Sequence, residues 1–218
     1  SFTEDNWNTA QSVTLTGVDD NDRDRNQDYK ISLSAAEQDP DPVVTTFAGS
    51  GSAGSADGTG TAASFYGPNA AIIVGGNLYV TDTSNHRIRK IVISTGAVTT
   101  LAGSNSGFAD GTGTAATFKF PNAITTDGTN LYVADTDNHL IRKIVISSGV
   151  VTTLAGSAGS QGSTNGTGTV ARFRYPRGMT TDGTNLYVVD SDNNLIRKIT
   201  PGGVVTTFAG SRSTSSED

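Results

Sequence analysis

Short apolar stretches separated by Gly, Asn and Ser turns run through residues 43–211 and predict β-strands instead of amphipathic helices. In one unit the pattern predicts four strands, at 70–74, 78–82, 87–94 and 98–102. The intervening turns are rich in residues that adopt positive φ or cap backbone groups. The run Ile91-Val92-Ile93 is apolar on both sides of the pleat, which indicates a sheet covered on both faces.

This pattern recurs. Val-Thr-Thr-(Phe/Leu)-Ala-Gly-Ser appears four times, with its first Thr 54, 53 and 54 residues apart, at Thr45, Thr99, Thr152 and Thr206. Other landmarks keep this period, among them Gly-Thr-Gly-Thr, Leu-Tyr-Val and Ile-Arg-Lys-Ile. A period near 50 with four strands per unit is the signature of a β-propeller.

One unit carries Pro-Asn-Ala-Ile at 121–124, Leu-Tyr-Val-Ala-Asp-Thr at 131–136, Asn-His-Leu-Ile-Arg-Lys-Ile at 138–144 and Val-Thr-Thr-Leu-Ala-Gly at 151–156. These motifs resemble the NHL repeat family, in the form common in secreted bacterial proteins. The resemblance extends over 43–211 and implies a β-propeller, usually of about six blades in this family.

We therefore predict an all-β chain: a partial β-propeller of three four-stranded blades, preceded by one orphan outer strand at 43–48. Three blades do not close a ring, and the last blade has its own outer strand at 204–209. We expect the parent chain to continue past Asp218. The alternative is closure by a second copy of the chain.

We expect the first 36 residues to belong to a separate domain. Polar and apolar residues alternate at 11–18 and 28–34, which predicts a β-hairpin with one buried face. The segment resembles the closing strands of Calx-beta-like, immunoglobulin-like sandwich domains of bacterial surface proteins. Residues 37–42, with two prolines, are the expected linker, 43–211 the propeller blades and 212–218 a tail.

The loop of this hairpin is acidic, with Asp19, Asp20, Asp22 and Asp24 close together. Carboxylate oxygens are the ligands that Ca²⁺ prefers, so calcium is the one cofactor that the sequence suggests. The spacing differs from the EF-hand loop, and a solvated acidic turn is the alternative that we favour.

Charge and composition exclude several functions. Residues 1–42 carry ten acidic and three basic side chains, a net charge of −7, and the remaining eleven acidic and twelve basic residues sum to +1. A nearly neutral repeat region gives no field that attracts nucleic acid. There is no cysteine, which excludes disulfides and thiol chemistry, and no apolar run long enough for a membrane span.

Polar residues also recur in every unit, which favours a structural role because a ring needs only one active site. We expect the residues at the ends of the second strands to cap turn amides, namely Asp82, Asn85, Asp135, Asn138, Asp190 and Asn193. His86 and His139 are expected to be turn residues, since the third unit has Asn194 there. The repeated Arg-Lys pairs are expected to pair between blades or to lie on a solvated edge.

Two functions remain. We favour a non-catalytic module, extracellular or at the cell surface of a bacterium, that binds a protein or glycan or assembles with itself. The alternative is a fragment of a propeller hydrolase or lyase whose active site needs further blades. Because variable loops on a rigid scaffold commonly carry recognition, we place binding on the crossover rim, near Phe108, Arg172, Arg174 and Arg177. These loops could equally be plain glycine-rich spacers.

Overall fold

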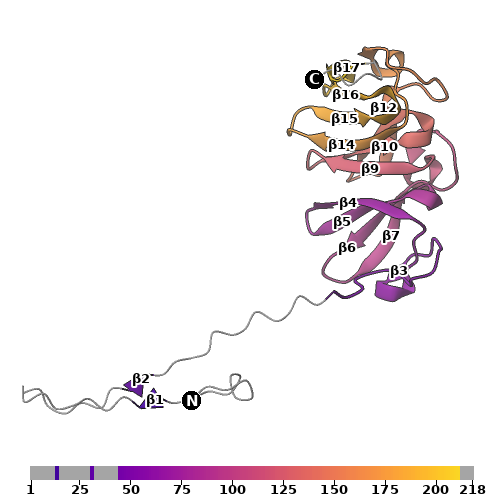
Figure 1. Ribbon diagram of the computed structural model, residues 1–218. Coiled ribbons are helices and arrows are strands. Elements are labelled where there is room, and N and C mark those ends of the chain that lie inside the picture. Colours follow the sequence, from indigo (N-terminus) through magenta and orange to yellow (C-terminus); the bar gives the residue numbers. More distant parts are fainter. Residues whose placement is uncertain (1–12, 15–29, 32–43, 212–218) are drawn as a thin grey trace, which may run out of the picture. The chain divides into compact units, whose positions relative to one another are not determined.

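A computed structural model describes residues 13–14, 30–31 and 44–211 (Figure 1). The chain divides into two units, residues 1–45 and 46–218. In the first unit, β1 (Val13–Thr14) pairs antiparallel with β2 (Lys30–Ile31). Both short strands lie inside the strands of the predicted hairpin. The acidic loop with Asp19, Asp20, Asp22 and Asp24 lies outside the described residues.

The second unit contains three antiparallel sheets of five strands each, which follow one another along the chain. In spatial order, the first sheet comprises β3 (Gly58–Thr59), β7 (Ala97–Ala102), β6 (Arg87–Val92), β5 (Asn77–Asp82) and β4 (Pro68–Val74). The second comprises β8 (Gly111–Thr112), β12 (Val150–Gly156), β11 (Leu140–Val145), β10 (Asn130–Asp135) and β9 (Pro121–Thr126). The third comprises β13 (Gly166–Thr167), β17 (Val204–Ala209), β16 (Leu195–Ile199), β15 (Leu186–Asp190) and β14 (Pro176–Thr181).

The fifth strand of each sheet was not predicted. The Gly-Thr-Gly-Thr segments, which lie outside the four predicted strands, each place two residues beside the last strand of the sheet, as Gly58 and Thr59 do beside Val98 and Ala97. A short 3₁₀ turn follows in each case: η1 (Gly60–Ala62), η3 (Gly113–Ala115) and η5 (Gly168–Val170). These segments therefore bind each crossover to the edge of its own sheet.

The predicted orphan strand at 43–48 is wrong for the residues that the structure describes, because 44–48 form no strand. A strand needs a neighbour that accepts its backbone hydrogen bonds. Gly49 N–H donates to Gly60 O (3.0 Å), just as Gly103 N–H, after β7, donates to Gly113 O (3.2 Å). Residues near Gly49 thus stand against the first sheet as the end of a preceding sheet would.

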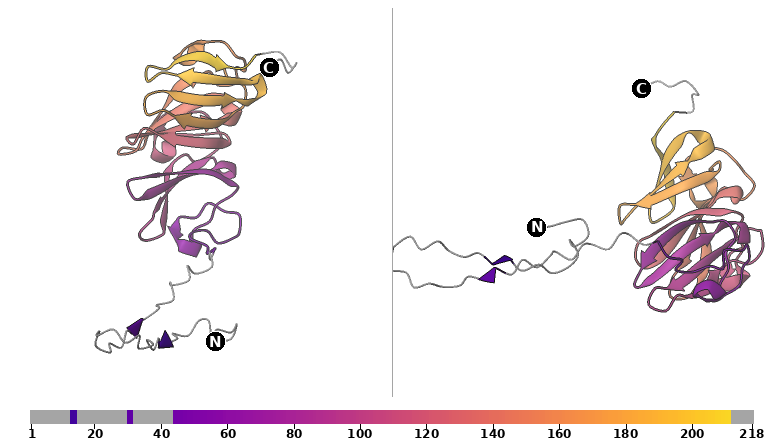
Figure 2. Two further views of the ribbon diagram at one scale, coloured as in Figure 1. Left: turned by 60° about the vertical axis from the view of Figure 1, so that its left-hand side comes forward. Right: turned by 60° about the horizontal axis from the view of Figure 1, so that its bottom comes forward.

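The three sheets stack face to face, and their inner strands β4, β9 and β14 lie side by side (Figures 1 and 2). One apolar core lies between the first and second sheets and includes Tyr79, Ile88, Phe118, Leu131, Val133 and Ile144. The other lies between the second and third and includes Tyr132, Ile141, Phe173, Leu186, Val188 and Ile199. The chain is therefore all-β, with sheets packed face to face as in propeller-like folds.

Candidate functional site

Each sheet contains a buried arginine that holds the preceding crossover. In the second sheet the Arg142 side chain is fully buried and pairs with Asp135 (3.0 Å) and Asp110 (2.8 Å). It also donates to the carbonyl oxygens of Thr117 and Ala109, both 3.0 Å away. We call this cluster the Arg–Asp centre. The other sheets repeat it with Arg89, Asp82 and Asp57, and with Arg197, Asp190 and Asn165.

The repeated Asp and Asn side chains have a structural role, as predicted, but they serve this centre: each Asp accepts from a backbone N–H sixteen residues upstream and not from the adjacent turn. Asp135 accepts from Lys119 N–H (2.7 Å), sixteen residues earlier, and from Asn138 (2.9 Å), and it gives the next 3₁₀ turn no cap. Complete burial raises the pKa of the Asp135 carboxyl to about 6 against these hydrogen bonds. The corresponding positions in the other sheets are Asp82 with Asn85 and Asp190 with Asn193.

The expected position of the Arg-Lys pairs is also wrong for the arginines. Arg142 neither pairs between sheets nor lies on a solvated edge, because all its ionic partners belong to its own sheet or to the crossover before it. Its guanidinium stacks on the Phe118 ring, 5.2 Å from the ring centre. Lys143, next in sequence, is half-buried. Each centre therefore fixes the crossover to its sheet. Together the three centres remove three cations from the surface.

The two histidines are turn residues that link neighbouring sheets. His139 ends the turn η4 (Thr136–Asn138) with φ 60°, and its Nδ1 accepts from Tyr175 N–H (3.2 Å). His86 ends η2 (Thr83–Asn85) and accepts from Phe120 N–H in the same way (3.2 Å). An imidazole that accepts at Nδ1 is not the doubly protonated form. Both links therefore need uncharged histidine.

We expect His139 to make stability depend on pH. Burial has the largest effect on the pKa of His139 and lowers it below 6.5. Nearby charges have smaller effects: Asp137 and Asp190 raise this pKa, and Lys119 lowers it. The unfolded chain therefore binds a proton near pH 6.5 while the folded chain does not. The contribution of neutral His139 to the free energy of unfolding is complete above pH 6.5 and decreases as the pH falls from there toward its lower folded pKa.

The test is His139→Asn, since Asn194 occupies this position in the third sheet with a φ of 56°. Urea unfolding at pH 7.5 and 5.5 should show the variant losing less stability than the wild type, by up to about 1.4 kcal/mol per pH unit. His86→Asn, at a half-exposed position, is the matched control and should show a smaller difference. Equal pH dependence in wild type and His139→Asn would contradict the prediction.

A groove opens at the crossover before the second sheet. Its volume is about 540 Å³, and its lining includes Phe108, Asp110, Leu140, Thr153 and Ser157. The Phe108 side chain is an exposed aromatic residue, 60% accessible. We call this the crossover groove. The sequence indicated Phe108, but Leu140, Thr153 and Ser157 come from other segments, and no sequence signal joins them.

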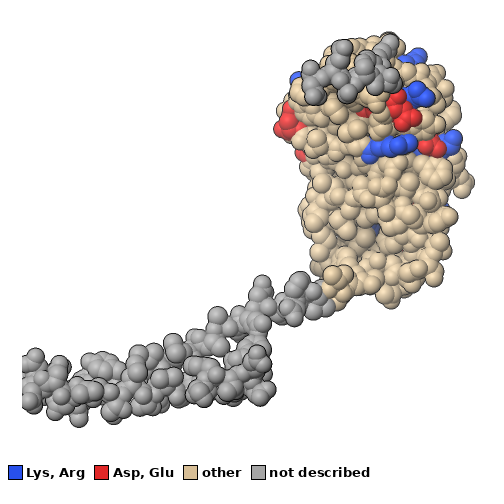
Figure 3. Space-filling view, viewed as in Figure 1, with Lys and Arg blue, Asp and Glu red and all other residues tan. Residues whose placement is uncertain are grey.

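The three predicted arginines lie elsewhere. The Arg172 guanidinium folds back onto the carbonyl oxygens of its own turn, Val170 and Ala171 among them (2.9 Å each). Arg174 and Arg177 lie 3.9 and 4.0 Å from Asp192, with about half of each side chain exposed. Charged side chains gather over the third sheet on the face in Figure 3. The structure therefore does not bring these arginines into the crossover groove.

Within the part of the chain that the structure describes, no three His, Asp or Glu side chains lie close enough together to hold a metal ion. The described helices are all single 3₁₀ turns, and none could cross a membrane.

The sequence of the first sheet matches a known repeat. Residues 65–91 match the NHL repeat. The chain is 42% identical over 82 residues to "NHL repeat-containing protein 2" of Gallus gallus, which covers 38% of this chain and 11% of that protein. It is 46% identical over 77 residues to "Protein SUPPRESSOR OF QUENCHING 1, chloroplastic" of Arabidopsis thaliana, covering 34% of this chain and 7% of that protein. The aligned NHL segments therefore span about a tenth of the relatives' length.

Solved structures support the architecture. An auxiliary nutrient binding protein of Bacteroides thetaiotaomicron is similar with a TM-score of 0.51 and 22% identity, over 63% of this chain and 34% of that one. A candidate phosphatase of this bacterium gives a TM-score of 0.54 at 22% identity, over 68% of this chain and 36% of that one. At this identity the likeness shows a propeller-like fold alone.

Proposed function

We propose that residues 44–211 form a non-catalytic binding module that holds a glycan in the crossover groove. The observation that carries the proposal is the exposed Phe108 ring beside a fixed carboxylate and three hydroxyl side chains, in a concavity of about 540 Å³. An aromatic ring offers a flat apolar surface to a sugar ring, while carboxylate and hydroxyl groups bond to its hydroxyls. Pockets of this kind combine apolar walls with a few placed polar groups.

The groove is prepared for a ligand because its polar groups are already oriented. Asp110 Oδ1 accepts from Arg142 (2.8 Å) and from Thr153 Oγ1 (3.1 Å) while 52% of the Asp110 side chain stays exposed. A carboxylate held in this way loses little rotational freedom when a ligand hydroxyl donates to it, which favours binding. The Arg–Asp centre would thus fix both the crossover and one wall of the groove.

The described side chains that line this groove include no group of residues suited to catalysis. General acid–base chemistry needs a titratable group free to exchange a proton. Asp110 is the one titratable side chain in the lining and is paired with the buried Arg142, so the lining offers no second acid or base to act with it. Burial of Arg142 and its two counterparts also leaves the Arg-Lys pairs with half their charge at the surface, which argues against nucleic acid as the ligand.

An extracellular or cell-surface location belongs to this proposal and rests on the resemblance of the first 36 residues to surface-protein domains. Labelling intact cells of the source organism with an antibody to residues 44–211 tests it. Labelling only after the cells are broken open would contradict the location.

Phe108→Ala should weaken glycan binding by at least about tenfold, or 1.4 kcal/mol. The probes are cellohexaose, xylohexaose, maltohexaose and chitohexaose, each titrated calorimetrically into the 218-residue chain. We expect at least one to bind. Ile73→Ala, at an exposed apolar residue of the first sheet, is the control and should bind like the wild type. Binding by none of the four, or equal binding by Phe108→Ala, would refute the glycan assignment.

A further inference from the structure

The two outer faces of the three-sheet stack carry apolar side chains that are buried wherever a neighbouring sheet covers them. On the outer face of the first sheet, Phe65 and Leu78 are partly exposed. Their counterparts in the second sheet, Phe118 and Leu131, are both 0% exposed. On the outer face of the third sheet, Tyr187 and Ile196 are partly exposed, whereas the corresponding residues of the other sheets are buried: Tyr79, Tyr132, Ile88 and Ile141.

The inner interfaces show what covers such a face. Between the first and second sheets, Thr83 Oγ1 donates to Pro121 O (2.6 Å), and the His86 ring packs edge-on against Phe120 (4.8 Å) while accepting from its N–H. The next interface repeats these contacts with Thr136 and Pro176 (2.6 Å) and with His139 and Tyr175 (4.7 Å). One turn of each sheet thus fits a fixed recess on the next.

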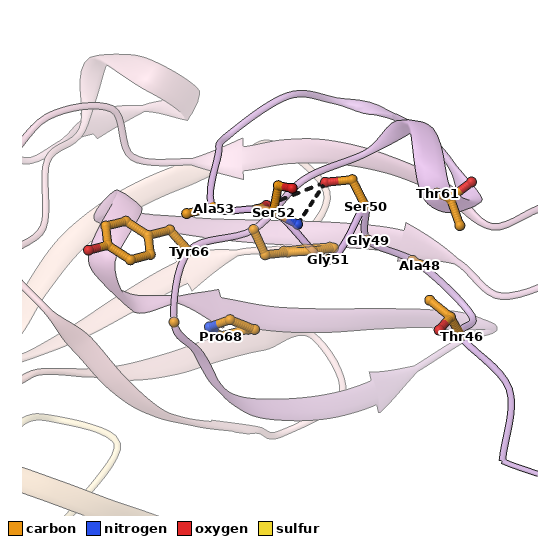
Figure 4. A pocket seen from close by; sticks show the side chains of 12 residues that line it. Thr46, Ala48, Gly49, Ser50, Gly51, Ser52, Ala53, Thr61, Tyr66 and Pro68 are labelled. Atoms are coloured by element: carbon orange, nitrogen blue, oxygen red, sulfur yellow. Dashed lines mark hydrogen bonds between the residues drawn. The ribbon is translucent and has the colours of Figure 1, made fainter.

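The first sheet has this recess open. Its outer face has a hollow of about 570 Å³, lined by Gly67, Pro68 and Ser50 among others (Figure 4). Gly67 and Pro68 hold the places of Phe120 and Pro121 in the repeat, and Gly67 shares the positive φ of Phe120 (59° and 49°). A second, apolar hollow of about 280 Å³ adjoins it and includes Phe65 and Leu78.

The third sheet carries the matching parts. Ser191 and Asn194 hold the places of Thr83 and His86, and Asn194 has the φ of 56° that His86 has. A serine hydroxyl can donate to Pro68 O as Thr83 does to Pro121 O. The Asn194 side-chain oxygen can accept from Gly67 N–H as the His86 nitrogen does from Phe120.

The sequence adds an independent match. Residues 43–50 and 204–211 are identical, Val-Val-Thr-Thr-Phe-Ala-Gly-Ser, whereas the two internal copies have Leu in place of Phe. Residues 46–49 of the first segment stand where a preceding sheet would end, and the second segment includes β17 of the third sheet. β17 of another molecule could therefore replace residues 46–49 against the first sheet without changing a side chain.

We propose that the outer face of the first sheet is the docking surface for the third sheet of a second copy of this chain. Ser191 and Asn194 enter the recess at Pro68 and Gly67, and Tyr187 and Ile196 pack into the apolar hollow. Three sheets are half of a six-bladed ring, so two copies joined by two such contacts close the ring and cover both outer faces. This surface is separate from the crossover groove.

The test is the mass of the 218-residue chain by sedimentation equilibrium between 1 and 200 μM. We expect twice the chain mass of 22.4 kDa. Ile196→Asp places a carboxylate on the outer face of the third sheet, where the isolated fold tolerates it because the position is partly exposed. It should raise the dissociation constant at least about 100-fold, since an unpaired charge would be buried. Circular dichroism melting checks that the variant is folded.

Leu78→Glu blocks the other face in the same way. Each variant alone should be monomeric, but an equimolar mixture keeps one intact contact and should form heterodimer. Phe108→Asp, an equal change of charge on the crossover groove, should leave the dimer intact while removing glycan binding. A wild-type mass of 22.4 kDa at every concentration, or folded variants that dimerise like the wild type, would overturn the proposal and assign these faces to sheets outside this sequence.

Discussion

Replacing Arg142 by Met is expected to lower the free energy of unfolding by about 3–5 kcal/mol, because it leaves the Asp135 carboxylate buried without its cation. Both side chains are 0% exposed and lie 3.0 Å apart. The substitution also frees the crossover, since Arg142 holds the carbonyl oxygens of Thr117 and Ala109. Urea unfolding monitored by circular dichroism measures the change.

Lys143→Met is the control for lost charge and should change stability by no more than about 0.5 kcal/mol, because this neighbour is half-buried and takes no part in the centre. The double variant Arg142→Met/Asp135→Leu should be less destabilised than the sum of its single variants, since no buried charge then lacks a partner. Additive effects would show that the pair does not act as a buried unit.

Phe118→Ala should cost about 3–5 kcal/mol, as large-to-small changes in a packed core do. Phe118 is 0% exposed, packs between the first and second sheets, and carries the Arg142 guanidinium over its ring. Phe65→Ala is the matched control, because Phe65 holds the same place in the first sheet, under Arg89 at 5.1 Å, but is partly exposed.

In dilute solution, where the outer face of the first sheet stays open, we expect Phe65→Ala to cost about 1–2 kcal/mol. Thermal and urea unfolding of both variants supply the comparison. Equal losses would mean that the stacking of a neighbouring sheet adds nothing to the burial of this residue, which would contradict the account of the inner interfaces.

The sequence by itself determined the repeat and the order of the strands. Predicted strands at 78–82 and 98–102 are close to β5 (Asn77–Asp82) and β7 (Ala97–Ala102). Their apolar spacing and turn residues report local backbone preferences, which one stretch of sequence contains in full. The apolar run at 91–93 predicted a sheet covered on both faces, which holds only in part: Ile91 is 3% exposed, whereas Ile93 lies beyond the end of β6 and is 39% exposed.

Only the tertiary structure decided which polar residues meet. Arg142 lies beside a lysine in sequence, as a surface residue would, but its partner Asp110 comes from 32 residues upstream, and Asp135 from seven. Residues 44–48, which we predicted to be an outer strand, form none, because no strand pairs with them in the part of the chain that the structure describes. Their sequence is nevertheless the same as that of residues 205–209 in β17. The crossover groove likewise draws Phe108, Leu140 and Thr153 from three segments. Pairing, burial and concavity depend on which segments become neighbours, and no local pattern contains that information.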